Sequence, residues 1–322
     1  MKLRRIYLIL LPLLMLTMAA GLCFGSAPLS LSELVSGAGV SRTILLGIRL
    51  PRVLAGLLAG IGLSCAGVLL QTVTSNDLAS PNIIGINSGA GLAVILLLTL
   101  APKAGAWLPM GAFCGAFGAA LVILAAGSRL GSSRSGILLI GIAITTLFNA
   151  AISFLSLLDE GILAQYNHFT VGSLRGIHLG DLLVPGILIF VSFCAAMALS
   201  GRLSVLSLGD AAASALGIRV KSLRIASMAC AAACAAAVVS FAGLLGFVGL
   251  VVPHIARALT GEKPARLLPV AALTGGILVI LADLLGRTLF APSELPVGIL
   301  MSLIGAPYFL ILLIRRKHHA GN

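Results

Sequence analysis

A chain of 322 residues in which 59% are hydrophobic and only 9% are charged cannot be an ordinary soluble domain, because about a quarter of the residues of such domains are charged. The net charge of +12 does not indicate nucleic acid as a partner, since the cytoplasmic loops of membrane proteins also collect Lys and Arg. We therefore expect an integral membrane protein that contacts lipid and binds no nucleic acid.

Apolar runs of about 20 residues recur along the chain, and this is the length that an α-helix needs to cross a bilayer. Their period is helical and differs from the alternation of an outer-membrane barrel. The sequence predicts a single all-α polytopic membrane domain over residues 1–322, with a tight, partly broken hairpin at 241–249 where three glycines gather. Ten spans are expected, at about 6–25, 53–73, 82–100, 107–127, 136–157, 181–200, 225–242, 244–259, 267–286 and 296–314.

The first apolar run follows Lys2-Leu3-Arg4-Arg5 and resembles a secretory signal. It is long for the apolar part of a signal peptide, and Leu22 precedes Cys23 where a lipoprotein signal needs a small residue. We therefore expect an uncleaved first helix. The six cysteines all lie in apolar runs. They lack the spacing of a metal site or a disulfide framework, so they are predicted to be packing residues.

The distribution of basic residues predicts the orientation. If the N-terminus is cytoplasmic, six of the 21 Lys and Arg residues fall on the outside, which leaves fifteen inside. This bias predicts a multi-pass protein with both termini cytoplasmic. The outer set is Arg42, Arg49, Arg52, Lys103, Arg175 and Arg287.

Arg49 and Arg52 stand outside the second span, against the general charge bias. One interpretation is that both side chains snorkel at a helix end. The other is an electropositive dock for an acidic protein surface, which would speed encounter and set register. Arg287 follows Asp283 by four residues, the favourable order for an ion pair within a helix. Asp283 is therefore expected to be a buried orienting partner and not a proton carrier.

Four stretches depart from what lipid-facing helices need. They are Arg49-Leu50-Pro51-Arg52 with the Gly-rich helix up to Gln71; 75–81 running into 85–91; 246–257; and 282–287 followed by 294–298 and 305–307. Over about residues 45–314, these motifs resemble the FecCD-type permeases of ABC importers, which carry iron-siderophores, haem or cobalamin.

The resemblance implies a multi-pass protein of a bacterial inner membrane with the type II ABC importer permease architecture. Two ten-helix subunits, as a homodimer or a paralogous heterodimer, would surround a central pathway. Two cytoplasmic ATPase subunits would bind ATP and Mg, and an extracytoplasmic binding protein would deliver a metal chelate for transport by alternating access. The chain itself would be a non-catalytic subunit without a cofactor or a metal site.

The resemblance also implies roles for particular residues. Arg49, Arg52 and Arg287 would receive acidic residues of the binding protein. The segment at about 203–223 would couple to the ATPase, and a solvated turn is its alternative interpretation. The coupling residues would be Gly209, Asp210, Leu216 and Gly217.

A cytoplasmic gate is implied at the turn of Asn76 and Leu78, with Arg134 and Ser135 as further gate candidates. The pathway candidates are Gln71 and Asn87. Relatives usually have Pro at the position of Asp77, so this turn is expected to be less rigid.

Competing functions are disfavoured by what the sequence lacks. No Gly-x-x-x-x-Gly-Lys-Ser/Thr phosphate loop occurs, so the energy must come from a partner or from a gradient. Asp283 is the only acidic residue well inside a span, which weakens the case for an ion-driven carrier.

His254 is expected to pack beside the Pro253 kink, and His168 and His178 to lie in an outer loop. The cargo stays open between siderophore, haem and cobalamin.

Overall fold

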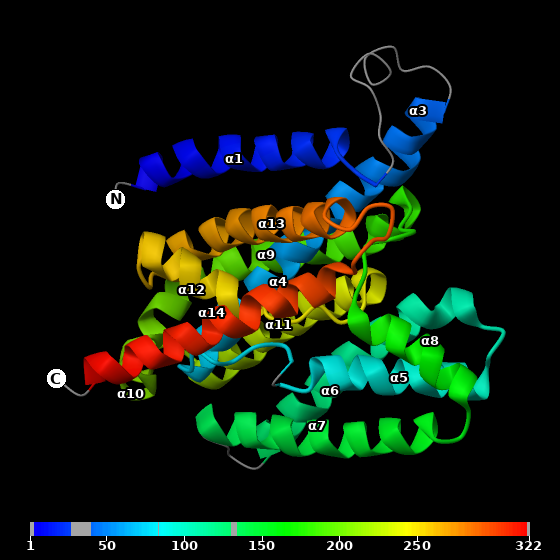
Figure 1. Cartoon of the computed structure of the whole chain (residues 1–322). Helices are drawn as coiled ribbons and strands as arrows, with labels where there is room; N and C mark the ends of the chain where they lie inside the picture. The colour runs from blue at the N-terminus through cyan, green and yellow to red at the C-terminus, as the bar shows by residue number, and fades with distance from the viewer. Residues whose placement is uncertain (1–2, 27–39, 83, 130–133, 321–322) are drawn as a thin grey trace.

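The protein is a bundle of long helices that lie side by side along a common direction (Figure 1). This computed structural model describes residues 3–26, 40–82, 84–129 and 134–320, and these residues form helices and turns without a strand. Both chain ends lie at the same end of the bundle as α10 (Figure 1). The helix bounds are α1 Leu3–Cys23, α3 Val40–Ile44, a π-helical turn Leu45–Arg49, α4 Leu50–Thr74, α5 Ile86–Leu100, a 3-10 turn Gly105–Trp107, α6 Leu108–Arg129, α7 Arg134–Ser156, α8 Glu160–Val171, α9 Leu179–Leu206, α10 Asp210–Ala215, α11 Val220–Ala242, α12 Val248–Thr260, α13 Pro264–Thr288 and α14 Val297–Ala320.

The predicted all-α fold is confirmed, and each predicted span overlaps one of these helices. Among the described residues, seven helices are long and apolar enough to cross a membrane by length and composition. Three further apolar helices are shorter: Ile86–Leu100, Val248–Thr260 and Val297–Ile311. The expected total of ten crossings and the direction of insertion stay predictions.

The connection between α7 and α9 contains a helix, α8, that the sequence interpretation treated as part of an outer loop. Its start is capped by Asp159, whose Oδ1 accepts a hydrogen bond of 2.7 Å from the backbone N–H of Gly161. A side-chain oxygen in this position satisfies an amide that the first helical turn leaves without a partner. The Asp before an apolar stretch was the signal for this helix.

The predicted hairpin at 241–249 is present. α11 ends at Ala242 and α12 begins at Val248, with Gly243 and Phe247 both at positive φ. The backbone N–H of Leu244 donates to the carbonyl of Phe169 on α8 at 3.3 Å. The break in the backbone is therefore held by α8.

α4 forms the centre of the bundle. It packs against α13, α11, α12 and α9, and 78% of the apolar window in Ile44–Thr74 is buried. In α7 the corresponding share is 11%. α4 is therefore a core helix, whereas most of α7 lies on the surface of this chain and faces lipid or another subunit.

Two glycine pairs set the distance between α4 and its neighbours. A Cβ atom at Gly60 would overlap the backbone of Gly275 on α13, and one at Gly67 would overlap the carbonyl of Gly249 on α12. Small residues at such positions let membrane helices pack backbone to backbone. Glycine at these positions therefore allows α4 to pack backbone to backbone against α12 and α13.

We predict that Gly60→Ala destabilises the protein by about 1–3 kcal/mol, because α4 and α13 must separate to admit the methyl group. Gly118→Ala on α6 is the matched control, since a Cβ there meets no atom within 4 Å. The control variant should melt no lower than the wild type, because replacing a helical Gly by Ala is favourable. Melting temperatures of the purified variants in detergent test this, and equal values for both would contradict it.

Candidate functional sites at the two ends of the bundle

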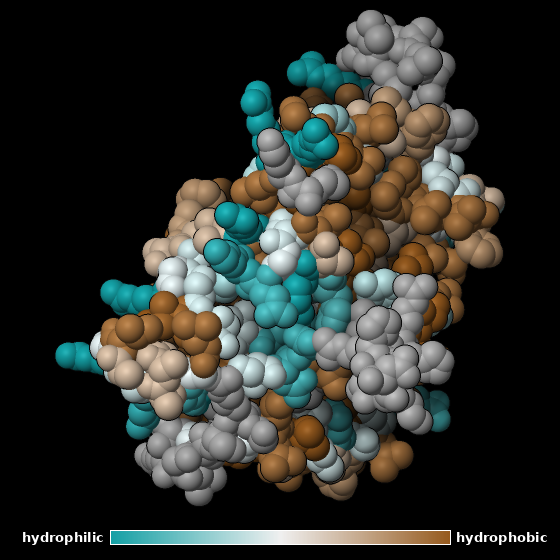
Figure 2. All heavy atoms as spheres, turned by 90° about the vertical axis from the view of Figure 1, so that its left-hand side faces the viewer, coloured by the Kyte–Doolittle hydropathy of each residue, from teal (hydrophilic) through white to brown (hydrophobic). Residues whose placement is uncertain are grey.

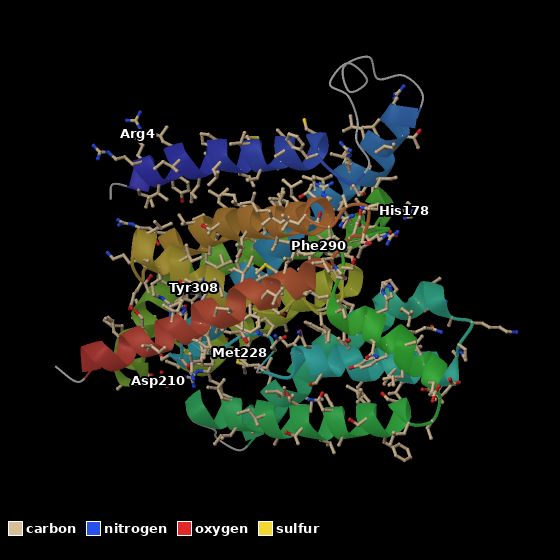
Figure 3. All side chains as sticks on the ribbon, in the orientation of Figure 1. Arg4, His178, Asp210, Met228, Phe290 and Tyr308 are labelled. Carbon is tan, nitrogen blue, oxygen red and sulfur yellow. The ribbon has the colours of Figure 1, made fainter. Side chains whose placement is uncertain are left out.

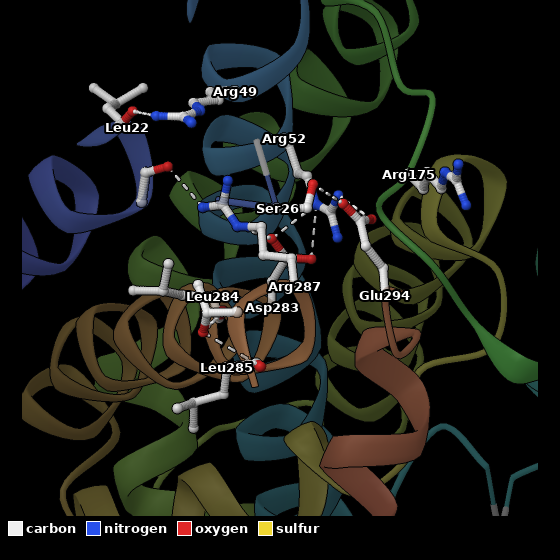
Figure 4. A network of polar contacts seen from close by, with 12 residues as sticks. Leu22, Ser26, Arg49, Arg52, Arg175, Asp283, Leu284, Leu285, Arg287 and Glu294 are labelled. Atoms are coloured by element: carbon white, nitrogen blue, oxygen red, sulfur yellow. Dashed lines mark hydrogen bonds and ion pairs between the residues drawn. The ribbon is translucent and has the colours of Figure 1, made fainter. Parts of the chain in front are cut away.

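A cluster of charged side chains joins α4, α13 and the loop after α13 (Figure 4). Nε of Arg52 donates to both carboxylate oxygens of Asp283, at 3.0 and 2.9 Å. Nη1 of Arg52 donates to Oε2 of Glu294 at 2.7 Å. Arg287 approaches the same Asp283 carboxylate, with its Nε 3.5 Å from Oδ2. One carboxylate of α13 thus pairs with two guanidinium groups.

The C-terminal end of α1 completes this cluster. Arg287 donates to the carbonyl of Gly21 at 2.6 Å. Arg49 donates to the carbonyls of Leu22 and Cys23, at 2.8 and 2.6 Å. The last carbonyls of a helix have no partner within the helix and carry partial negative charge. The first helix is therefore tied to the arginines by hydrogen bonds as well as by its packing on α13.

The cluster is buried. Arg49, Arg52 and Arg287 are 3%, 6% and 2% exposed, and Asp283 is 3% exposed. The structure brings together the three arginines for which a docking role was expected, but in this conformation it holds all three inside the protein with internal partners. Snorkelling of Arg49 and Arg52 was the wrong alternative, and Asp283 has the predicted role of a buried orienting partner.

Glu294 lies at the edge of this cluster and is partly exposed. Burial acts to raise the pKa of its carboxyl, but hydrogen bonds from Arg52 and from Ser26 at 2.7 Å, together with the charges of Arg52 and Arg175, lower the pKa below its ordinary value. The Arg52–Glu294 pair is therefore present at neutral pH and is lost only as the pH falls through that lowered pKa. Arg175, which lies on the Glu294 side of the cluster (Figure 4), and Arg42 on α3 are exposed.

The coupling segment predicted at the other end is a short helical elbow. Gly209 and Gly217, both at positive φ, bracket α10. The carboxylate of Asp210 accepts a hydrogen bond of 2.8 Å from Arg224 on α11, and Leu216 is 66% exposed. Asp210 lies at the end of the bundle opposite to His178 and Phe290 (Figure 3). The elbow is thus held to the bundle and presents an apolar side chain outward.

The predicted gate turn is held by local hydrogen bonds. Oδ1 of Asn76 accepts from the backbone N–H of Leu78 at 2.9 Å, and the N–H of Asn76 donates to the carbonyl of Gln71 at 3.2 Å. This is the Asx-turn geometry that Asn favours. Asn76, Leu78 and Gln71 therefore form one local group.

Arg257 on α12 was missed by the sequence interpretation and joins this group to α12. It lies 3.0 Å from Oδ1 of Asp77 and donates to Oε1 of Gln71 at 3.2 Å. The amide of Gln71 in turn contacts the carbonyl of Gly249 at 3.4 Å. Asp77, where a more flexible turn was expected, is thus constrained by an ion pair. The sequence signal for this ion pair was the presence of an Arg and an Asp at the same predicted face of the membrane.

The remaining candidates do not gather with these groups. Asn87 donates to Asn82 within the same connection. Arg134 and Ser135 begin α7, and their side chains lie outside the described part of the structure. His178 caps α9 together with Asp181, while His168 is exposed on α8. In the described ranges no group of three His, Cys, Asp or Glu residues could hold a metal ion.

Comparison with known proteins assigns this fold to a family. The family model of the FecCD transport family matches residues 13–315. A solved structure of a metal-chelate type ABC transporter in an inward-facing conformation superimposes with a TM-score of 0.89 and 30% identity, covering 97% of this chain and 99% of that one. The chain belongs to the FecCD transport family.

Named relatives are permeases of several iron import systems. The Fe(3+)-citrate import system permease YfmE of Bacillus subtilis is 40% identical over 82% of this chain and 80% of its own length. The hemin transport permease HmuU of Yersinia pestis is 38% identical over 87% and 85%. The ferric enterobactin permease FepD of Escherichia coli is 37% identical over 97% and 95%. The similarity therefore extends over nearly full-length permeases with different cargoes.

We predict that Asp283→Asn lowers stability by about 3–5 kcal/mol, because it removes the carboxylate that two buried guanidinium groups share. Glu262→Gln, in the exposed turn before α13, should leave stability unchanged. Adding Arg287→Gln to Asp283→Asn should recover part of the loss, since one unpaired cation is removed. Unfolding of the purified variants measures this, and equal stability of Asp283→Asn and Glu262→Gln would contradict it.

Proposed function

We propose that this chain is the permease subunit of an ABC importer that moves a ferric chelate of the siderophore class across the inner membrane. The observation that carries this proposal is the family match over residues 13–315 together with the fold match over 97% of the chain. Relatives that carry ferric citrate and ferric enterobactin support this cargo class. Haem is the second candidate, because HmuU is similar to the same extent.

The exposed apolar surface of the single chain supports the presence of a second permease subunit. Large apolar side chains are exposed along α7 and α14, among them Leu147 and Phe154 on α7 and Leu303 and Leu310 on α14. Extended apolar faces need lipid or a partner. A second copy of this chain, or a paralogue, would cover part of them and enclose the pathway.

ATP binding and hydrolysis, with Mg, we assign to a separate cytoplasmic subunit that contacts α10. The chain has no phosphate loop of its own. The elbow from Gly209 to Gly217 carries the exposed Leu216 and is fixed to α11 through Asp210. A push on this elbow would therefore be transmitted to α11. The ATPase must bind the two permease conformations with different affinity, because otherwise its binding would not shift the equilibrium between them.

The opposite end is proposed as the landing surface of an acidic binding protein. The buried cluster contains three guanidinium groups, of Arg49, Arg52 and Arg287, against the two carboxylates of Asp283 and Glu294. It is thus one negative charge short of neutrality. An incoming carboxylate would meet exposed Arg175 first and would then replace Glu294 on Arg52.

A gradient-driven carrier is disfavoured by the same cluster. A coupling carboxylate in a membrane has to exchange a proton or a metal ion during transport. Asp283 is buried and is engaged by both Arg52 and Arg287. Its negative charge is already compensated, so it is poorly suited to bind a coupling ion.

We predict that Glu294→Gln raises the affinity of the binding protein by about three- to tenfold, because the internal carboxylate no longer competes for Arg52. Glu160→Gln, an exposed carboxylate on α8, is the control and should leave the affinity unchanged. Titration of binding protein against the permease in detergent provides the measurement. Unchanged or weaker binding by Glu294→Gln would overturn the exchange of carboxylates.

We predict that Leu216→Asp weakens binding of the ATPase subunit by about 30-fold, as for loss of an apolar anchor of an interface. Leu289→Asp serves as control, since Leu289 is similarly exposed, at 63%, beyond the outer end of α13. Pull-down of the ATPase and ATP-dependent uptake in proteoliposomes report the effect. Accumulation of chelate by this chain alone, driven only by an ion gradient, would overturn the proposed function.

A further inference from the structure

A cavity opens between the last turns of α9 and the first turns of α11, next to the α10 elbow. Its volume is about 410 Å³, within the range of about 300–1,000 Å³ that is usual for small-molecule sites. The polar lining consists of Arg202, Arg219 and Ser222, and the apolar walls include Leu199, Leu223 and Ala226. The cavity borders the predicted coupling segment at 203–223, but no role has been assigned above to Arg202, Arg219 or Ser222.

The two arginines of this cavity carry positive charge that the chain does not neutralise. Both side chains are exposed, and neither forms an ion pair or a side-chain hydrogen bond with the part of the chain that the structure describes. The neighbouring Arg224 differs, because it is paired with Asp210 at 2.8 Å. The nearby carboxylate is therefore already engaged, and the cavity has an excess of two positive charges.

A stripe along α9 leads from the apolar surface to this cavity. Val184, Ile187, Val191, Cys194 and Ala198 recur every three or four residues and are exposed, and Arg202 continues the same stripe. Residue 202 lies eighteen residues after residue 184, which corresponds to about 27 Å of helix at 1.5 Å per residue. The hydrocarbon layer of a bilayer is about 30 Å thick. Arg202 therefore lies at the level of the lipid headgroups.

The position in the bundle indicates which headgroups are within reach. The cavity lies at the end that carries α10 and both chain termini (Figure 1), and hydrophilic residues gather across this end (Figure 2). The excess of basic residues predicts that this end is cytoplasmic. Basic pockets between membrane helices on this side bind the phosphate headgroups of anionic lipids.

We propose that the cavity is a binding site for an anionic phospholipid of the phosphatidylglycerol or cardiolipin type. Arg202 and Arg219 donate charge-assisted hydrogen bonds to the phosphate oxygens, and the hydroxyl of Ser222 is a further donor. Leu199 and Leu223 contact the start of the acyl chains, which continue along the stripe of α9. This proposal rests on the membrane orientation and is independent of the cargo and of ATP.

A lipid bound at this site would affect the conformation of the elbow around α10. Gly217 and Ile218, which connect α10 to α11, also line the cavity. The backbone N–H of Ile218 donates to the carbonyl of Ala213 at 3.0 Å, so this connection is folded back on α10. A lipid headgroup held by Arg219 would therefore favour the conformation of the elbow seen in this structure.

The test measures the melting temperature of the full chain in neutral detergent while lipid is added. Phosphatidylglycerol should raise the melting temperature of the wild type saturably, and phosphatidylcholine should not. In Arg202→Gln/Arg219→Gln the apparent affinity for phosphatidylglycerol should fall about tenfold or more, as for loss of charge-assisted hydrogen bonds. Without added lipid this variant should melt like the wild type, which shows that it folds.

The matched control is Lys263→Gln/Arg266→Gln, which removes two exposed charges at the start of α13 and should keep the wild-type response. An equal loss in both double variants would mean diffuse electrostatic attraction and would overturn the proposed site. An equal response to inorganic phosphate would assign a site for a soluble anion instead of a lipid. Unchanged lipid binding together with lost ATPase binding in the Arg202→Gln/Arg219→Gln variant would make the cavity part of the ATPase interface.

Discussion

Backbone contact between α4 and its neighbours is the constraint on which both ends of the bundle depend. Lipid is as apolar as a leucine side chain, so membrane helices associate through close packing and not through the hydrophobic effect. Gly60 against Gly275 and Gly67 against Gly249 provide that packing. α4 carries Arg52 near one end and Gln71 near the other, about 28 Å apart at 1.5 Å per residue. A shift of α4 along α12 or α13 would therefore alter both charged groups together.

Buried charges are compensated differently at the two ends of the helix bundle. At the end that carries the arginine cluster, carboxylates of α13 and the following loop and carbonyls of α1 surround three guanidinium groups, and one positive charge is left in excess. At the opposite end, Arg257 is balanced by Asp77 and by the amide of Gln71, so the turn at Asn76 is held by contacts within the chain. Partners are thus expected to act by replacing internal ligands.

The cavity beside α10 adds lipid to the components that can act on coupling. A short helix bracketed by two glycines has little stiffness of its own, and only Arg224 among the cavity's neighbouring arginines fixes it by an ion pair. Lipid, ATPase and α11 would then all meet at one connection. This arrangement would make transport sensitive to the composition of the membrane.

The sequence by itself determined the membrane class and the positions of the long apolar helices, because a bilayer dictates the length and apolarity of its spans. It also grouped Arg49, Arg52 and Arg287 at one end by motif and charge bias. Only the tertiary structure decided the partners of these arginines, because a partner such as Glu294 is 242 residues away from Arg52 in the chain. Which loop covers which helix follows from packing. For the same reason the burial of the arginines, the Asp77–Arg257 pair and the unpaired charges of Arg202 and Arg219 were not readable from local pattern.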